Sequence, residues 1–80
     1  MDKRDRHWVK PQLVGERIND LIRERNISQR EFAKKLGVRD SIVSMWIWGT
    51  REPRVATVIR ICETFDVSAD WLLCLEKNEN

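Results

Sequence analysis

Apolar residues recur every three to four positions along most of this chain of 80 residues, which is the period of an amphipathic helix. No segment alternates apolar and polar residues for long enough to predict a strand, so an all-α fold is expected. The first helix should begin at Pro11, because proline is favoured in a first helical turn, and should end near Arg25. Its buried stripe is expected to hold Val14, Ile18, Leu21 and Ile22.

The second predicted helix has the clearest start signal in the chain. Ser28 can cap it, and Glu31, three residues later, can reach back as in a capping box. Gly37 suits the left-handed position that ends a helix. A third helix should begin about three residues further on and end near Trp48, with Gly49 as its stop. Two short helices joined by a turn that contains glycine form the pattern of a helix-turn-helix.

Two further helices are predicted in the last third of the chain. After a loop that contains Pro53, one helix should run from about Val55 to Phe65. Ser68 should cap a short fifth helix, with Asp70 in its first turn, where negative charge is favoured. The expected core positions are Val55, Val58, Ile59, Cys62 and Phe65 in the fourth helix and Trp71, Leu72 and Leu75 in the fifth.

Charge is distributed unevenly over what the length limits to a single domain. We expect a basic N-terminal arm over residues 1–10, the helical domain over residues 11–75 and a frayed tail over residues 76–80. Residues 28–54 carry six basic side chains against three acidic ones, whereas residues 55–80 carry two against five. This distribution suits a domain that turns one face toward phosphate, and an ordinary mixed surface is the alternative.

The sequence gives little support to catalysis, metal binding or membrane insertion. It contains no glycine-rich phosphate loop and no nucleophile elbow, so we expect neither an enzyme nor a cofactor. Cys62 and Cys74 form no CxxC motif, and only His7 could join them at a metal, so they are expected to be reduced and mostly buried. The longest uncharged apolar run, Trp71–Leu75, is too short for a membrane span, and residues 1–10 lack the apolar core of a signal peptide.

The chain resembles the Cro/cI (XRE) family of phage-repressor type over about residues 11–75. The resemblance rests on the joint spacing of SQREFAKKLGV at residues 28–38, Ser41, Val43–Ser44, Trp46, Gly49, Pro53 and VSADWLL at residues 67–73. It implies a compact five-helix, lambda-repressor-like domain whose helix-turn-helix consists of the second and third helices.

The resemblance also implies a function and partners. The third helix would enter the major groove of double-stranded DNA, and a homodimer would bind a near-palindromic operator. Such a protein would be a cytoplasmic, nucleoid-associated transcriptional regulator, as a repressor or an activator, without an apparent small-molecule ligand. Leu73 and Leu75 are the candidate dimer contacts, unless they simply close the core.

The third helix separates into two sides when residues 41–48 are placed on a helical wheel. The core-like side holds Ile42, Val43, Trp46 and Ile47, and the side left for DNA holds Ser41, Ser44, Met45 and Trp48. Gln29 matches the family position at which a side chain meets a phosphate, although a solvated first-turn residue is the alternative. Arg39 could read guanine, and Asp40 could accept from cytosine N4 or merely bond backbone amides.

The remaining candidate contacts are basic. Arg51 and Arg54 follow the third helix and are expected to meet backbone phosphate. Lys34 and Lys35 could do the same at longer range, or belong to a solvated helix face. The expected DNA-binding residues are therefore Gln29, Arg39, Asp40, Ser41, Ser44, Met45, Trp48, Arg51 and Arg54.

Three features depart from the family pattern. Met45 and Trp48 stand where polar or basic residues are common, so they could contact a thymine methyl and a sugar, or mark a protein-binding patch. The rival function is accordingly a protein-interaction module that has lost DNA binding. Ile22 and Ile47 replace both partners of a salt bridge found in phage relatives, and we predict that they touch. Residues 1–10, which include Trp8, could reach a neighbouring groove or be a solvated tail.

Overall fold

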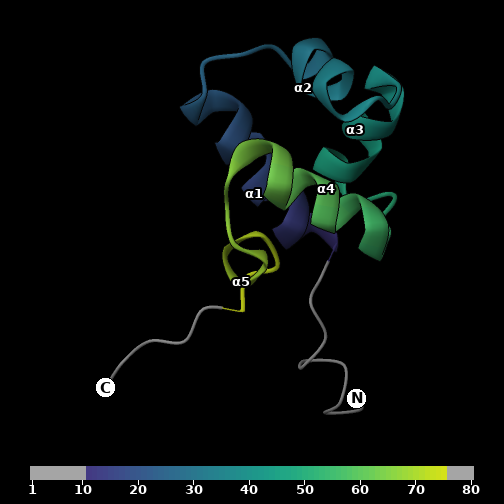
Figure 1. Ribbon diagram of the computed structural model, residues 1–80. Coiled ribbons are helices and arrows are strands. Elements are labelled where there is room, and N and C mark those ends of the chain that lie inside the picture. The colour runs from purple at the N-terminus through teal and green to yellow at the C-terminus, as the bar shows by residue number, and fades with distance from the viewer. Residues whose placement is uncertain (1–10, 76–80) are drawn as a thin grey trace.

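The computed structural model describes residues 11–75, and within that range it contains five helices and no strand. The predicted arm at residues 1–10 and the predicted tail at residues 76–80 lie outside the described residues. α2 and α3 lie together at one end of the molecule and α5 lies at the other, with α1 and α4 between them (Figure 1). The helices are α1 (Pro11–Glu24), α2 (Gln29–Leu36), α3 (Asp40–Trp48), α4 (Val55–Phe65) and α5 (Ala69–Leu72).

Local signals in the sequence set the helix ends as predicted. The hydroxyl oxygens of Ser28 and Ser68 each accept the backbone N–H of the residue three positions later, at 3.0 Å. Gly37 and Gly49 follow α2 and α3 with φ angles of 75° and 79°. A side chain is strained in this left-handed region, so glycine at both positions ends its helix at low cost.

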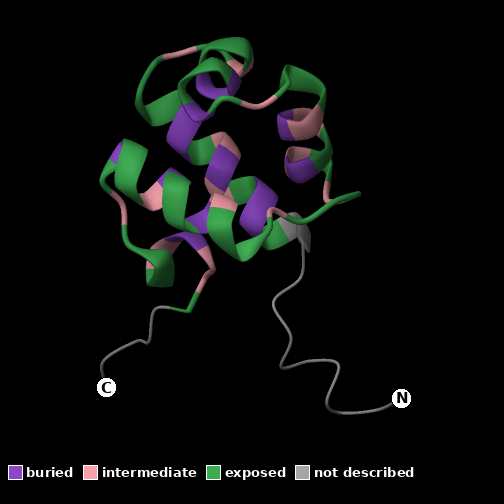
Figure 2. Ribbon diagram, turned by 45° about the vertical axis from the view of Figure 1, so that its right-hand side comes forward, coloured by how far each residue is buried: buried purple, intermediate pink, exposed green. Residues whose placement is uncertain are grey.

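The core is a single cluster of buried apolar side chains drawn from all five helices, and the buried positions are purple on the ribbon of Figure 2. Within it the rings of Phe32 and Phe65 stack, with centroids 4.7 Å apart and an interplanar angle of 14°. This contact ties α2 to α4. The cluster consists of Val14, Ile18, Leu21, Ile22, Phe32, Ala33, Leu36, Val43, Trp46, Val58, Ile61, Phe65 and Leu72.

The predicted bounds of α4 are confirmed, but its predicted buried face is wrong in part. Val55 is 77% exposed, Ile59 is 52% exposed and Cys62 is only partly buried. Ile61, which the prediction omitted, is fully buried. Apolar residues occupy two sides of this helix, so periodicity alone offered two possible core faces. Packing in the folded domain selects Val58, Ile61 and Phe65.

The fifth helix is shorter than the pattern suggested. It ends at Leu72, which is fully buried, and Leu75 lies beyond it with half of its surface exposed, so the predicted core position of Leu75 is wrong. Trp71 is partly buried, and the guanidinium of Arg17 lies 5.0 Å from the centre of a Trp71 ring. This cation–π contact fastens α1 to α5.

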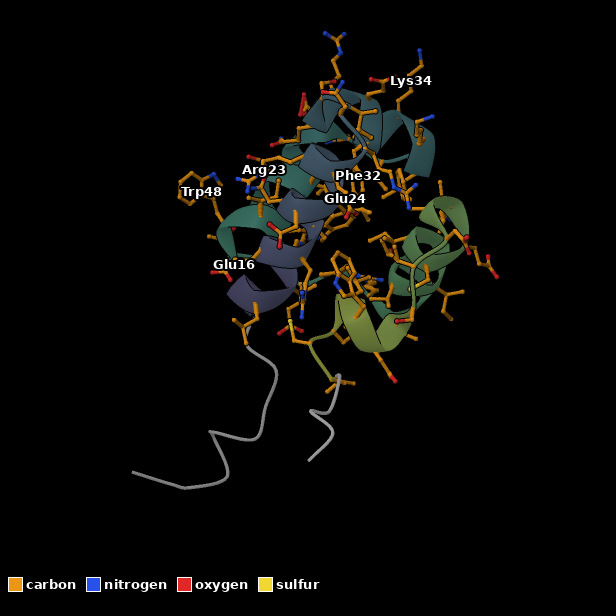
Figure 3. The ribbon with its side chains drawn as sticks, turned by 90° about the vertical axis from the view of Figure 1, so that its left-hand side faces the viewer. Glu16, Arg23, Glu24, Phe32, Lys34 and Trp48 are labelled. Atoms are coloured by element: carbon orange, nitrogen blue, oxygen red, sulfur yellow. The ribbon has the colours of Figure 1, made fainter. Side chains whose placement is uncertain are left out.

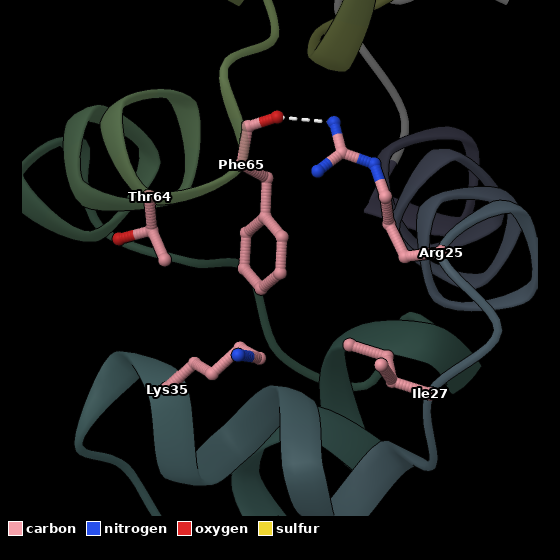
Figure 4. A pocket seen from close by; sticks show the side chains of 5 residues that line it. All are labelled: Arg25, Ile27, Lys35, Thr64 and Phe65. Carbon is pink, nitrogen blue, oxygen red and sulfur yellow. Dashed lines mark hydrogen bonds between the residues drawn. The ribbon is translucent and has the colours of Figure 1, made fainter.

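Two arginines fasten helix ends to neighbouring helices. Arg60 Nη1 donates to the carbonyl oxygen of Leu36 at 3.0 Å, at the end of α2. Arg25 Nη2 donates to the carbonyl oxygen of Phe65, the last residue of α4, and its guanidinium lies 5.8 Å from the Phe65 ring (Figure 4). A cation is favoured at the carbonyl end of a helix, where the last oxygens lack helical partners.

Candidate nucleic-acid interface

The predicted division of α3 into a core side and an outer side is confirmed. Val43 is fully buried and Trp46 is 3% exposed, while Ile42 and Ile47 are partly buried against the core. On the opposite side, Ser41, Met45 and Trp48 are exposed and Ser44 is partly exposed. Trp48 projects outward from the body of the domain (Figure 3). The inner side therefore anchors the helix, and the outer side remains available to a partner.

Gly15 sets how closely α3 approaches the body of the domain. A Cβ atom at this position would lie 2.2 Å from the carbonyl oxygen of Trp46 and 2.7 Å from that of Ile47. Both distances are too short for any side chain to fit, so the backbones of α1 and α3 touch only because residue 15 is glycine. The sequence interpretation gave Gly15 no role, since a glycine inside a helix carries no local signal of what it faces.

A shallow groove of about 530 Å³ runs beside the outer side of α3. Most of its lining was predicted, and the residue that was missed is Thr50, whose hydroxyl donates to the carbonyl oxygen of Met45 at 3.3 Å. Thr50 directly follows the glycine that ends α3, and that position was the available signal. The lining residues are Gln29, Asp40, Ser41, Ser44, Met45, Trp48 and Thr50.

Gln29 links the two helices of the motif. Its Nε2 atom donates to the carbonyl oxygen of Asp40 at 3.3 Å, which joins the first residue of α2 to the first residue of α3. A primary amide carries two N–H donors, so one donor of Gln29 remains for an external acceptor at the mouth of the groove. This position is compatible with both roles predicted for Gln29, a phosphate contact and a solvated first-turn residue.

The three predicted arginines do not line this groove. Arg39 occupies the N-cap position of α3 without capping it through its side chain, and it is exposed. Arg51 and Arg54 are also exposed and line a separate hollow of about 170 Å³ together with Glu52. Cations therefore lie at the start of α3 and, beyond its end, in a hollow that Ile42 and Trp46 of its core side also line, while the groove itself holds none.

Six of the eight arginines within residues 11–75 form two groups by their contacts, while Arg23 lies 4.0 Å from Asp20 on the same helix and Arg30 is exposed on α2. Arg17, Arg25 and Arg60 contact a ring or a carbonyl oxygen in the body of the domain. Within residues 11–75, Arg39, Arg51 and Arg54 have no hydrogen bond or ion pair of their side chains. The three arginines of the second group thus lie at the start of α3 and just beyond its end.

The described residues offer no obvious catalytic centre. No group of three or more His, Cys, Asp and Glu side chains within residues 11–75 could hold a metal ion. Burial, and secondarily the nearby carboxylate of Glu63, raises the pKa of the Cys62 thiol, which disfavours the nucleophilic thiolate. Cys62 and Cys74 are free and partly buried thiols. None of the described helices has the length and apolar character needed to cross a membrane.

Comparison with known proteins gives matches of one kind. The model of the helix-turn-helix domain family matches residues 15–77. An uncharacterized HTH-type transcriptional regulator, YqaE of Bacillus subtilis, is 33% identical over 67 residues, which cover 84% of this chain and 58% of the relative. An uncharacterized HTH-type transcriptional regulator of Haemophilus influenzae is 37% identical over 57 residues, which cover 71% of this chain and 23% of the relative. The chain thus spans less than two thirds of either relative, 58% of the first and 23% of the second, and no solved structure matches significantly.

Proposed function

Because the chain belongs to the helix-turn-helix domain family, we propose that it is a sequence-specific transcriptional regulator that binds double-stranded DNA through α3. The observation that carries this proposal is the outer side of α3, an exposed groove flanked by arginines that have no internal partner. Both relatives bear the name of transcriptional regulators, which supports the same role. We place the protein in the Cro/cI (XRE) type on the residues that carry that resemblance.

The proposed roles follow from the positions of the side chains. Ser41, Ser44, Met45 and Trp48 would face base edges in the major groove, together with Asp40 at the start of α3. Gln29 would donate its remaining N–H to a phosphate at the groove mouth. Arg39, which lies at the start of α3 and outside the groove lining, would read a guanine. Arg51 and Arg54 would contact backbone phosphates beyond the end of α3.

The assembly we propose is a cytoplasmic, nucleoid-associated homodimer that acts as a repressor at a near-palindromic operator. A single helix reads only a few base pairs, so two copies one helical turn apart multiply the specificity. Leu73 and Leu75 are the proposed dimer contacts, and Leu75 is half exposed. The domain would occupy residues 11–75, with residues 1–10 as an arm that reaches the adjacent groove and residues 76–80 as a tail.

Selection from a randomised duplex pool, followed by salt titration of the enriched site, tests DNA recognition. Removing one phosphate contact should lower the slope of log affinity against log salt by about 1 and weaken binding about tenfold at 0.1 M salt. We expect this result for Arg51→Met and Arg54→Met. Arg60→Met is the matched control, because Arg60 already bonds the carbonyl oxygen of Leu36 and should leave the slope unchanged.

The results also decide the assembly and the regulatory sign. A near-palindromic enriched site, with sedimentation of the complex as two chains per duplex, is expected for the homodimer. A reporter promoter that contains this site should lose expression when the protein is present if it is a repressor. Equal salt slopes for all three variants would contradict the placement of the phosphate contacts.

The second candidate is a protein-interaction module, which the 78% exposure of Trp48 beside Met45 favours. Docking through these apolar side chains would be far less sensitive to salt than phosphate contact is. Failure of the selection to enrich any duplex, at low and at physiological salt, would decide for this candidate.

A further inference from the structure

The α3 groove combines two apolar side chains with few hydrogen-bond donors. Only Asp40 among its seven lining residues is ionisable, and none is a cation. Guanine presents two acceptors in the major groove, which arginine or lysine reads best through paired donors. Inside this groove the free side-chain donors are the hydroxyls of Ser41 and Ser44, the second N–H of the Gln29 amide and the single indole N–H of Trp48, and none of these offers the paired, charged donors of an arginine. The groove is therefore poorly equipped to select guanine.

Met45 and Trp48 supply most of the exposed apolar surface of α3. Met45 is 39% exposed and Trp48 is 78% exposed. They stand three residues apart, so they lie on the same side of the helix. With a rise of 1.5 Å per residue, they are separated by about 4.5 Å along the helix axis, so a helix inclined to the duplex axis in the major groove offsets them by about one base-pair step of 3.4 Å. The two side chains can thus meet the edges of neighbouring base pairs.

Apolar side chains that enter the major groove gain most from an apolar partner. The C5-methyl group of thymine is the one such group on the major-groove edges of the four standard bases. Contact with polar base edges would remove water from those edges without supplying hydrogen bonds, whereas contact with a methyl group removes apolar surface from water on both sides.

We propose that Met45 and Trp48 are specificity-determining residues that select 5-methylpyrimidines, an inference that rests on the proposed DNA-binding function. Each operator half-site then places thymine methyl groups against these two side chains, at neighbouring base pairs. Ser41 and Ser44 complete the contact through hydrogen bonds to adjacent polar edges without selecting guanine. The flexible thioether of Met45 allows it to follow the position of its methyl group closely.

The experiment replaces single thymines of the selected operator by uracil, which removes only the methyl group. Binding of the full chain to each labelled duplex is measured by fluorescence anisotropy. Each contacted methyl should be worth about a fourfold change in Kd, the factor expected for burying one such group. In Met45→Ala, uracil at one of these positions should no longer weaken binding. In Trp48→Ala, the same should hold at a neighbouring position. Cytosine placed at either position should bind more weakly than 5-methylcytosine by a similar factor.

Two control variants separate a specific effect from a general one. Ile59→Ala also removes an exposed apolar side chain, but from α4, and should keep the full sensitivity to uracil. Met45→Leu keeps an apolar side chain at position 45, so this variant should also keep the full sensitivity to uracil. Circular dichroism of each variant shows that its helices are intact before binding is compared.

The outcomes distinguish this inference from the function on which it rests. An enriched operator that binds equally well with uracil at every position would overturn the methyl selection and leave the regulator intact. A uracil effect that persists unchanged in both alanine variants would overturn the assignment to Met45 and Trp48. Enrichment of no duplex at all would overturn the inference together with the proposed function.

Discussion

The arginines of the α1–α4–α5 body and those beside α3 are the same residue type in opposite circumstances. In the body, Arg25 and Arg60 donate to carbonyl oxygens at helix ends, and Arg17 lies over Trp71. Beside α3, Arg51 and Arg54 line an open hollow and contact no internal acceptor among the described residues. The first group stabilises the fold, whereas the guanidinium groups of the second are exposed and available to an external anion. Basic residues therefore indicate a binding surface only after those with internal contacts have been set aside.

The same contrast applies to the two sides of α3. Its inner side is held by backbone contact with α1 at Gly15 and by the burial of Val43 and Trp46. Its outer side carries exposed side chains that no other helix covers. A rigid inner side matters for recognition because a displacement of about 1 Å is enough to spoil a set of directional contacts.

Among the substitutions considered, replacement of Gly15 should have the largest effect on the free energy of unfolding, because it separates α1 from α3. In Gly15→Ala the new Cβ meets two backbone oxygens, so α1 and α3 must separate, which costs about 3 kcal/mol as overpacking does. Alanine returns about 1 kcal/mol through its helix propensity, which leaves a net loss of about 2 kcal/mol in the free energy of unfolding. Urea denaturation followed by circular dichroism measures this loss.

Gly37→Ala provides the matched control for that substitution. Its nearest neighbour would be Arg60 Nη1 at 4.0 Å, so there is space, and the cost of about 1 kcal/mol comes from the φ angle of 75° alone. The two variants should also differ in operator binding, which only the Gly15 variant should impair through displacement of α3. Equal losses of stability in the two variants would show that close approach at Gly15 is not what holds α3.

Arg25→Met and Arg60→Met should sharpen the division between the two groups of arginines. Each removes a charge-assisted hydrogen bond to a carbonyl oxygen but keeps most of the apolar stem. Such bonds contribute about 1.5–3 kcal/mol when buried, and partial exposure reduces the expected loss here to about 1 kcal/mol per variant. Thermal unfolding measures the loss. Arg51→Met should stay within about 0.5 kcal/mol of the unsubstituted chain, because it removes no internal contact. A comparable loss in Arg51→Met would abolish the distinction.

Much of the fold was predictable because its signals are local. The caps at Ser28 and Ser68 and the glycines at 37 and 49 each act within one helical turn, so the sequence near them was sufficient to place the helix ends. The division of α3 was also predictable, since only one of its sides is continuously apolar. The outer side of α3 predicted from the sequence supplies most of the residues that line the groove.

What sequence reasoning missed depends on contacts between distant segments. The buried side of α4 was chosen by Phe32 and the rest of the core, not by the period of α4 itself. The role of Gly15 depends on carbonyl groups some thirty residues away. The structural arginines could not be told from the flanking ones, because their acceptors are backbone oxygens, which every residue offers. Thr50 is the exception, because its hydroxyl donates to Met45 only five residues earlier and its place after Gly49 was a local signal.

The smallest expected effect is the coupling between Ile22 on α1 and Ile47 on the inner side of α3. Ile22 is 7% exposed, and Ile47 is partly buried against the same core, so neither could carry an unpaired charge cheaply. Their predicted contact can be measured by a double-mutant cycle with Ile22→Ala and Ile47→Ala. Residues in contact should show a coupling of at least about 0.5 kcal/mol in the free energy of unfolding.

A second cycle, with Ile22→Ala and Ile59→Ala, is the control for that coupling. Ile59 is more than half exposed on α4, so these two substitutions should be additive. Coupling in the first cycle alone would mean that Ile22 and Ile47 act as one packed apolar unit between α1 and α3. Additivity in both cycles would mean that α3 is held by the Gly15 approach and by its own buried residues.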